Sequence, residues 1–125
     1  MRFRLTLSLF FAFSLLPYAA KAEPIVTSLS GTNLYDDCAT KADDPNALVR
    51  ATLCMGYISA ITDSLSFGNS INGLRACIPV GVDMNQIVDI SKAAIKSQPE
   101  RRHLVASILL AEALSRSFPC RKTAH

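Results

Sequence analysis

His103 is the only histidine inside the predicted fold and could serve as a general base; the other histidine, His125, is the last residue. Glu100 lies three residues before it and Ser107 four residues after it. A base, an orienting carboxylate and a nucleophilic hydroxyl are the parts of a hydrolase site. On a single helix, however, these side chains would follow one surface and could not enclose a substrate. We therefore interpret them as capping and packing groups and predict that the protein is not an enzyme, with a weak hydrolase as an alternative.

The cysteines are the second group of residues in this sequence that could carry out chemistry. An even number of cysteines in a short exported chain predicts disulfides, with buried free thiols as the alternative. We predict one disulfide across the short connection between the first two helices and one between the start of the third helix and the end of the fourth. No Cys-x-x-Cys pair, His-rich cluster or glycine-rich phosphate loop occurs, so we expect no metal and no cofactor. The predicted pairs are Cys38–Cys54 and Cys77–Cys120.

The first 22 residues predict export from the cytoplasm. Arg2 and Arg4 precede an apolar run from Leu5 to Leu16, and Ala20-Lys21-Ala22 supplies a small-x-small cleavage site. The apolar run of about 12 residues is too short to span a bilayer, which needs about 20. We therefore predict a cleaved signal peptide over residues 1–22, a periplasmic location and no stable membrane anchor.

The remaining chain, residues 23–125, has the length of one domain. Three of the 13 basic residues precede the predicted cut and all 10 acidic residues follow it, so the formal charge of the mature chain is zero. A nucleic-acid-binding domain normally carries a surplus of basic residues. The sequence therefore predicts that nucleic acid is not a partner.

The mature sequence predicts an all-α fold, a small bundle of about four helices held together by the disulfides. Thr32, Asp44 and Asp83 are the predicted N-caps of the first three helices. Pro99 is expected to end the third helix near Ser97 and could also start the next one, whose apolar pattern runs from His103 to Ser117. The expected ranges are 33–38, 45–67, 83–97 and 103–117. The predicted core takes one apolar stripe from each of the longer helices: Leu53, Tyr57, Ile61, Ile87, Leu104, Ile108 and Leu114.

A loop over residues 68–82 separates the second predicted helix from the third and is long for a compact domain. It combines polar residues with two apolar residues and an arginine, and exposed groups of these kinds form the centres of many interfaces. The alternative is that Ile71 and Leu74 anchor the loop to the bundle. The residues that we predict to bind a partner are Asn69, Ser70, Ile71, Asn72, Gly73, Leu74 and Arg75.

Four segments of the mature chain resemble, in order, the Rap/Tai immunity proteins. Ala60 departs from the pattern, because a second glycine is expected in that helix. The resemblance implies a small exported helical protein that neutralises a peptidoglycan amidase delivered by type VI secretion. The segments are Cys54–Asp63 (CMGYISAITD), Cys77–Val82 (CIPVGV), Pro99–Ala106 (PERRHLVA), and Ala113-Leu114 followed by Phe118-Pro119-Cys120.

A small exported domain without catalytic groups is most simply a binding protein. With the resemblance, we predict a periplasmic immunity protein that binds an amidase toxin and occludes its active site. A rigid scaffold that presents a loop to a cleft can inhibit without chemistry of its own. A homodimer is left open beside a monomer. The alternative function is a small helical periplasmic acid-stress chaperone, which would unfold at low pH to expose apolar surface.

Overall fold

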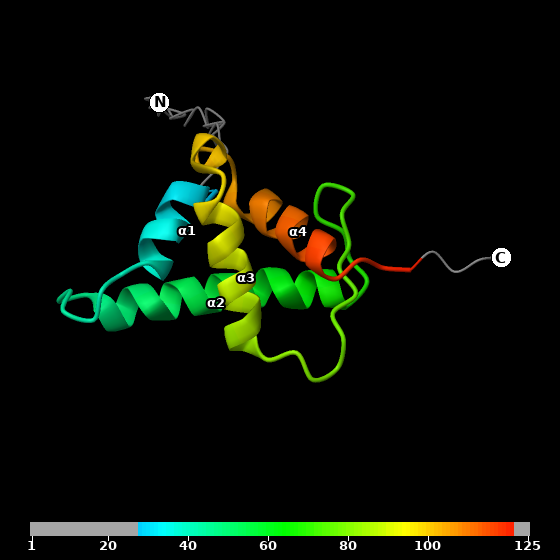
Figure 1. Cartoon of the computed structure of the whole chain (residues 1–125), viewed down its shortest axis with the longest axis horizontal. Helices are drawn as coiled ribbons and strands as arrows, with labels where there is room; N and C mark the ends of the chain where they lie inside the picture. The colour runs from blue at the N-terminus through cyan, green and yellow to red at the C-terminus, as the bar shows by residue number, and fades with distance from the viewer. Residues whose placement is uncertain (1–27, 122–125) are drawn as a thin grey trace, which may run out of the picture.

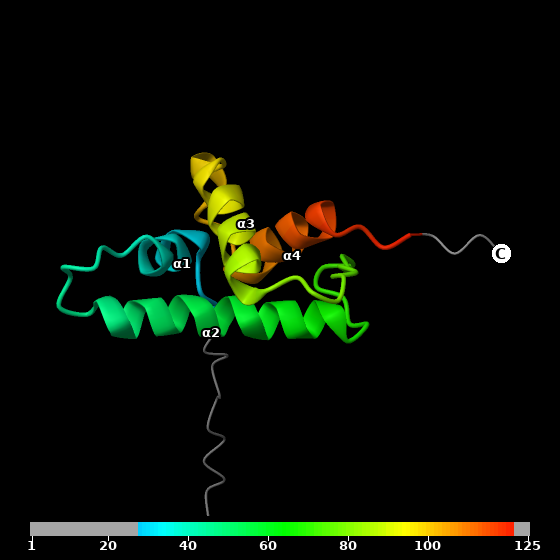
Figure 2. The same ribbon diagram turned by 60° about the horizontal axis from the view of Figure 1, so that its bottom comes forward.

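The computed structural model describes residues 28–121, which form four α-helices and one short 3-10 helix. The predicted signal peptide lies outside the described residues. Within them, β-structure is limited to isolated bridges, so the predicted all-α class is confirmed. Figure 1 shows the order of the elements, and Figure 2 shows that α1, α3 and α4 lie on one side of the long helix α2. The elements are α1 (Gly31–Cys38), α2 (Ala47–Ser66), α3 (Met84–Lys96), η1 (Pro99–Arg101) and α4 (Ala106–Ser117).

The observed helix starts agree only in part with those predicted from the sequence. The prediction for α3 is confirmed, because the Asp83 carboxylate accepts a hydrogen bond from the backbone N–H of Gln86 at 2.9 Å. The prediction for α1 is wrong: Ser30, not Thr32, is the N-cap. The Thr32 hydroxyl instead donates to the carbonyl of Arg102 at 3.2 Å. Thr32 therefore lies inside the first turn of α1, and its hydroxyl bonds to a distant carbonyl and does not cap the helix.

The start of α2 is also later than predicted. Asp44 does not cap the helix; its Oδ1 accepts from the backbone N–H of Asn46 at 2.7 Å and closes a turn that precedes Ala47. Aspartate makes such local bonds readily, which is why it favours caps and turns alike. The helix then runs to Ser66, close to its predicted end.

The predicted start of the last helix at His103 is wrong, and the reason is a pairing between distant segments. The backbone N–H of Gly31 donates to the carbonyl of Leu104 at 2.9 Å, and the N–H of Ala106 donates to the carbonyl of Leu29 at 2.8 Å. These bonds form an antiparallel bridge that holds Val105 extended, at φ −61° and ψ 127°. Helix α4 can begin only after this residue.

Gly31 allows the two segments to approach closely. A Cβ atom on this buried glycine would lie 2.5 Å from Cδ1 of Leu109 and 3.0 Å from the carbonyl oxygen of Arg102. The leucine could move by a rotamer change, but the carbonyl belongs to the paired backbone. The first turn of α1 can therefore lie against η1 and α4 only if residue 31 has no side chain.

Arg102, the C-cap of η1, contacts both α1 and α3 at this same point. Its guanidinium carbon lies 4.0 Å from the centre of the Tyr35 ring of α1, a cation–π contact. Its Nε donates to the carbonyl of Ile95 and its Nη2 to that of Lys96, each at 3.0 Å. The arginine thereby donates to two carbonyls in the last turn of α3, one of which, that of Ile95, also accepts from the backbone N–H of Gln98 at 3.4 Å.

The core lies between α2 and the three helices that cover it. Of the predicted core residues, Ile87 and Leu114 are buried, and Tyr57 and Ile61 are half-buried against them. Leu104 and Ile108 are half-buried, and the prediction for Leu53 is wrong because its side chain is 57% exposed. The buried stripe of α2 is rotated by one residue from the predicted one. It consists of Cys54, Ile58, Thr62 and Leu65.

Both predicted disulfides are present. Cys38–Cys54 joins the last residue of α1 to α2, with Cα atoms 5.1 Å apart. Cys77–Cys120 joins the loop after α2 to the segment after α4, with Cα atoms 4.9 Å apart. A backbone hydrogen bond of 2.9 Å from Cys77 N–H to the carbonyl of Phe118 supports the second link. Cross-links of this kind are valuable in a domain that is too small to bury a large core.

We predict that Gly31→Ala destabilises the fold by about 1–3 kcal/mol, the usual cost of forcing extra atoms into a packed site. The physical reason is the fixed Arg102 carbonyl, which the new methyl group would meet. Urea unfolding measures the change. Asn33→Ala, at an exposed position in the same turn, is the matched control and should leave the unfolding free energy almost unchanged. Equal stability of Gly31→Ala and the control would contradict the proposed crowding.

We also predict that Glu112 makes stability depend on pH. Its carboxylate forms two hydrogen bonds with the Arg101 guanidinium, at 2.6 and 2.8 Å, and this contact lowers the pKa of Glu112 below its ordinary value. A lowered pKa contributes stability above the unfolded-state pKa, and the contribution is lost as pH falls through the folded-state pKa. Glu112→Gln should therefore weaken the fold at neutral pH and do so less at about pH 3. Urea unfolding at both values tests this, and an equal loss at both would argue against the ion pair.

Candidate partner-binding surface

The predicted binding loop after α2 contains a tight hairpin turn. The N–H of Ile71 donates to the carbonyl of Leu74 at 3.1 Å, and the N–H of Leu74 donates back to the carbonyl of Ile71 at 3.0 Å. Asn72 and Gly73 have φ values of 53° and 75°. Positive φ at both central positions is the signature of a type I′ turn, for which Asn-Gly is the preferred sequence. The dipeptide is thus a signal that could have predicted this turn.

The seven predicted binding residues divide into two groups. Ile71 and Leu74 are half-buried and pack against the core, as the anchoring alternative describes. The other members of the set are exposed: Asn69, Ser70, Asn72, Gly73 and Arg75. The turn therefore directs its apolar pair inward and its polar groups toward solvent.

Two large apolar side chains are exposed here, one just before the loop and one within it. Phe67, the C-cap of α2, is 82% exposed, and Val80 is fully exposed. Val80 lies in a turn that a 3.3 Å hydrogen bond closes, from the N–H of Val82 to the carbonyl of Pro79. Gly81 supplies the positive φ of 98° that the turn needs. Pro-x-Gly is a recognisable turn pattern, but exposure of the central valine depends on how the turn faces the bundle.

The loop is held in its middle and at its C-terminal end. Ala76, next to the polar turn, is buried, and Cys77 carries the link to Cys120. Beyond them, Ile78 and Val82 are half-buried against the core. The polar turn and Val80 therefore project from a backbone that is fixed by packing and by a covalent bond.

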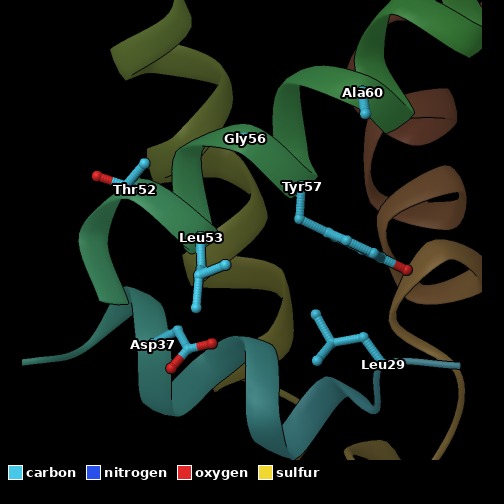
Figure 3. A pocket seen from close by; sticks show the side chains of 7 residues that line it. All are labelled: Leu29, Asp37, Thr52, Leu53, Gly56, Tyr57 and Ala60. Carbon is cyan, nitrogen blue, oxygen red and sulfur yellow. The ribbon is translucent and has the colours of Figure 1, made fainter. Parts of the chain in front are cut away.

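A second surface feature lies on the other side of the molecule's core, where α1 runs beside α2. It is an apolar hollow of about 500 Å³. In Figure 3, Leu53 and Tyr57 extend from α2 toward α1 and toward Leu29. The carboxylate of Asp37 lies at the edge, where it accepts from Nε of Arg50 at 3.0 Å. The lining residues are Leu29, Asp37, Thr52, Leu53, Gly56, Tyr57 and Ala60.

The three side chains considered for hydrolysis do not share one helix. Glu100 belongs to η1, His103 lies in the turn that follows it, and Ser107 belongs to α4. His103 and Glu100 are exposed.

Within residues 28–121, no group of three or more His, Cys, Asp or Glu side chains could hold a metal ion. None of the described helices has both the length and the apolar character needed to cross a bilayer.

Fold and surface together define a small helical domain with two disulfides and a rigid, exposed loop. A sequence model of the family described as Rap1a immunity proteins matches residues 30–120. This range starts at the N-cap of α1 and ends at the last cysteine, so it includes every described helix and both disulfides. The chain belongs to this family, which confirms the resemblance seen in the sequence. No curated protein and no solved structure matches the chain.

We predict that Gly73→Ala destabilises the protein by about 1–2 kcal/mol, the cost of placing a side chain in the left-handed region. No described atom lies within 4 Å of the added methyl group, so the effect would come from the backbone alone. Urea unfolding provides the measurement. Asn72→Gly, at the neighbouring position of positive φ, should be tolerated. An unaltered stability of Gly73→Ala would mean that the turn is not held in this conformation.

Proposed function

We propose that this protein is a periplasmic immunity protein that binds a peptidoglycan amidase delivered by type VI secretion and occludes the amidase active site. The observation that carries the proposal is the family match over residues 30–120, which covers the whole described fold. The predicted signal peptide and the two disulfides support an oxidising compartment outside the cytoplasm. Peptidoglycan, the substrate of the amidase, lies in that compartment.

Inhibition of this kind requires shape and rigidity in place of catalytic groups. A loop that is already ordered loses little conformational entropy when it enters a cleft, so more of its contact energy appears as affinity. The type I′ turn, the anchors Ile71 and Leu74, and the Cys77–Cys120 link all provide that order. The loop can therefore fill a cleft without first having to fold.

The exposed groups of the loop suit contact with a polar active site. We propose that Asn69, Ser70, Asn72 and Arg75 form hydrogen bonds with the rim of the cleft, while Ile71 and Leu74 support them from behind. Arginine and large apolar side chains are frequent at the energetic centres of interfaces. Phe67, next to the loop, and Val80, within it, are exposed apolar residues that could supply the central contacts.

The first experiment is capture of the toxin. Tagged mature protein would be incubated with proteins secreted by its own strain and by competing strains, and bound proteins identified by mass spectrometry. The proposal expects an amidase, and expects the purified chain to stop that amidase from cleaving peptidoglycan at an equimolar dose. The mass of the complex reports whether one or two copies of the chain bind. Loss of tertiary structure and dye binding at low pH, without a captured amidase, would support the chaperone alternative.

We predict that Arg75→Glu weakens amidase binding at least tenfold, or about 1.4 kcal/mol, because the reversed charge would face the same cleft. Its side chain is exposed, so the melting temperature should stay the same. Lys41→Glu is the matched control, since it makes the same charge reversal in the α1–α2 connection, at the opposite end of α2 (Figure 1). Calorimetric titration measures both affinities. Equal affinities of the two variants would place the binding surface elsewhere on the protein.

A further inference from the structure

Helix α2 is apolar on its outer side as well as on the side that faces the core. Its 20 residues include only two charged side chains, those of Arg50 and Asp63. A helix that is apolar all round is normally buried. Within residues 28–121, however, the other three α-helices lie on one side of α2 (Figure 2). Four of the six large apolar side chains that are exposed in this part of the chain belong to α2: Leu48, Val49, Leu53 and Met55.

Gly56 lies in the middle of this outer side. No described atom comes within 4 Å of the point where its Cβ would be, so no described element uses the space. A glycine within a helix weakens that helix, and the close approach of another backbone is a common reason for its presence. Thr52 and Ala60 lie one turn before and one turn after it, and all three residues line the hollow. A second helix can therefore approach α2 most closely at Gly56.

The two charged residues of α2 are placed almost symmetrically about Gly56. Arg50 precedes it by six residues and Asp63 follows it by seven. Asp63 is exposed and takes part in none of the ion pairs among the described residues. Arg50 faces Asp37 with Nε at 3.0 Å and Asp44 with Nη1 at 3.8 Å, which leaves Nη2 for a further carboxylate. A copy of α2 that runs in the opposite direction would bring this base and this acid together at both ends.

The hollow between α1 and α2 has the position that such a pairing needs. In an antiparallel pair that crosses at Gly56, each residue comes level with the residue equally far beyond Gly56 in the other copy. Leu53, which is 57% exposed, then comes level with the space between Tyr57 and Ala60. The last two residues line the hollow (Figure 3). A two-fold axis keeps Leu53 on the α1 edge of both helices and makes the contact twice.

We propose that two copies of this chain form a symmetric dimer in which their α2 helices pack antiparallel and cross at Gly56. Leu53 of each copy fills the hollow of the other, and Asp63 of each copy pairs with Arg50 of the other. Burial of the apolar side chains of α2 supplies the driving force. The charge pairs fix the direction of the two helices, since a parallel pair would place like charges together.

The dimer goes beyond the proposed function and does not depend on it. The loop after α2 turns back toward α4, where the N–H of Cys77 donates to the carbonyl of Phe118 at 2.9 Å (Figure 2). The candidate binding residues 69–75 therefore lie on the side of α4, and the dimer contact lies on the outer side of α2. One dimer would present two such loops, so the expected complex contains two chains and two toxin molecules.

Sedimentation equilibrium of the mature chain, purified from the periplasm, measures its mass over a series of concentrations. The proposal expects a species with twice the mass of one chain. A chain that stays monomeric at every concentration would overturn the proposal. Binding of that monomer to phosphatidylcholine vesicles would then show that lipid, and not a second copy, covers α2.

Val49 tests the direction of the pair, because it is 60% exposed and comes level with Asp63 of the other copy. Val49→Glu should weaken the dimer at least tenfold, since two acids would face each other, and Val49→Lys should weaken it less than threefold. Adding Asp63→Lys to Val49→Glu should restore the dimer. Ala51→Glu is the matched control, at an exposed position about 200° round the same helix, and should have less than a threefold effect. Equal effects of Val49→Glu and either Val49→Lys or Ala51→Glu would overturn the proposal.

Gly56→Leu separates loss of the dimer from loss of the fold. Leucine favours a helix more than glycine does, and the space beside residue 56 is open within one copy. The melting temperature of the diluted, monomeric chain should therefore not fall. The same side chain would hold two helices apart at their crossing, so the dimer should weaken at least tenfold. A variant that dimerises as tightly as the unchanged chain would overturn the proposal.

None of these measurements needs the toxin. A chain that dimerises through α2 but captures no amidase would refute the proposed function alone. A chain that captures an amidase but remains a monomer would refute the proposed dimer alone.

Discussion

The backbone pairing of Leu29–Thr32 with Arg102–Ala106 is the constraint on which the rest of the fold depends. It joins the start of α1 to the start of α4 across a separation of about 70 residues. Arg102 extends the same junction to α3 through two carbonyls and to α1 through the Tyr35 ring. Since three helices meet at one point, they all lie on one side of α2. Among residues 28–121, no helix packs on the opposite side of α2 (Figure 2).

Local signals in the sequence were sufficient for most of the helices and for both disulfides. The Asp83 cap and the Pro99 break depend on neighbouring residues, so they could be predicted. The buried stripe of α2 could not be predicted, because this helix carries apolar residues on both of its sides. A spacing of four fits Leu53–Tyr57–Ile61 as well as it fits Cys54–Ile58–Thr62, and only the tertiary contacts select the second. The extended conformation of Val105 likewise depends on Leu29, which is distant in sequence.

The candidate surface shows the same division between local and distant causes. The position of the loop followed from its length and composition, and the Asn72-Gly73 turn could have been predicted from that dipeptide. Which side chains face inward depends on the packing of the bundle, so Ile71 and Leu74 could be assigned only from the structure. The apolar hollow needs α1, α2 and Leu29 together. The residue pattern of any one segment therefore cannot predict a hollow that several segments form together.

The Cys77–Cys120 link also makes part of the chain a closed ring. The two cysteines are 43 residues apart in sequence, and the ring contains α3, η1 and α4. A protease that cuts one peptide bond inside this ring leaves a nicked molecule whose two pieces are still covalently joined. The exposed turn at Val80 and the exposed residues of η1 are the points where such a cut would fall. The ring therefore gives this part of the chain tolerance to a single break.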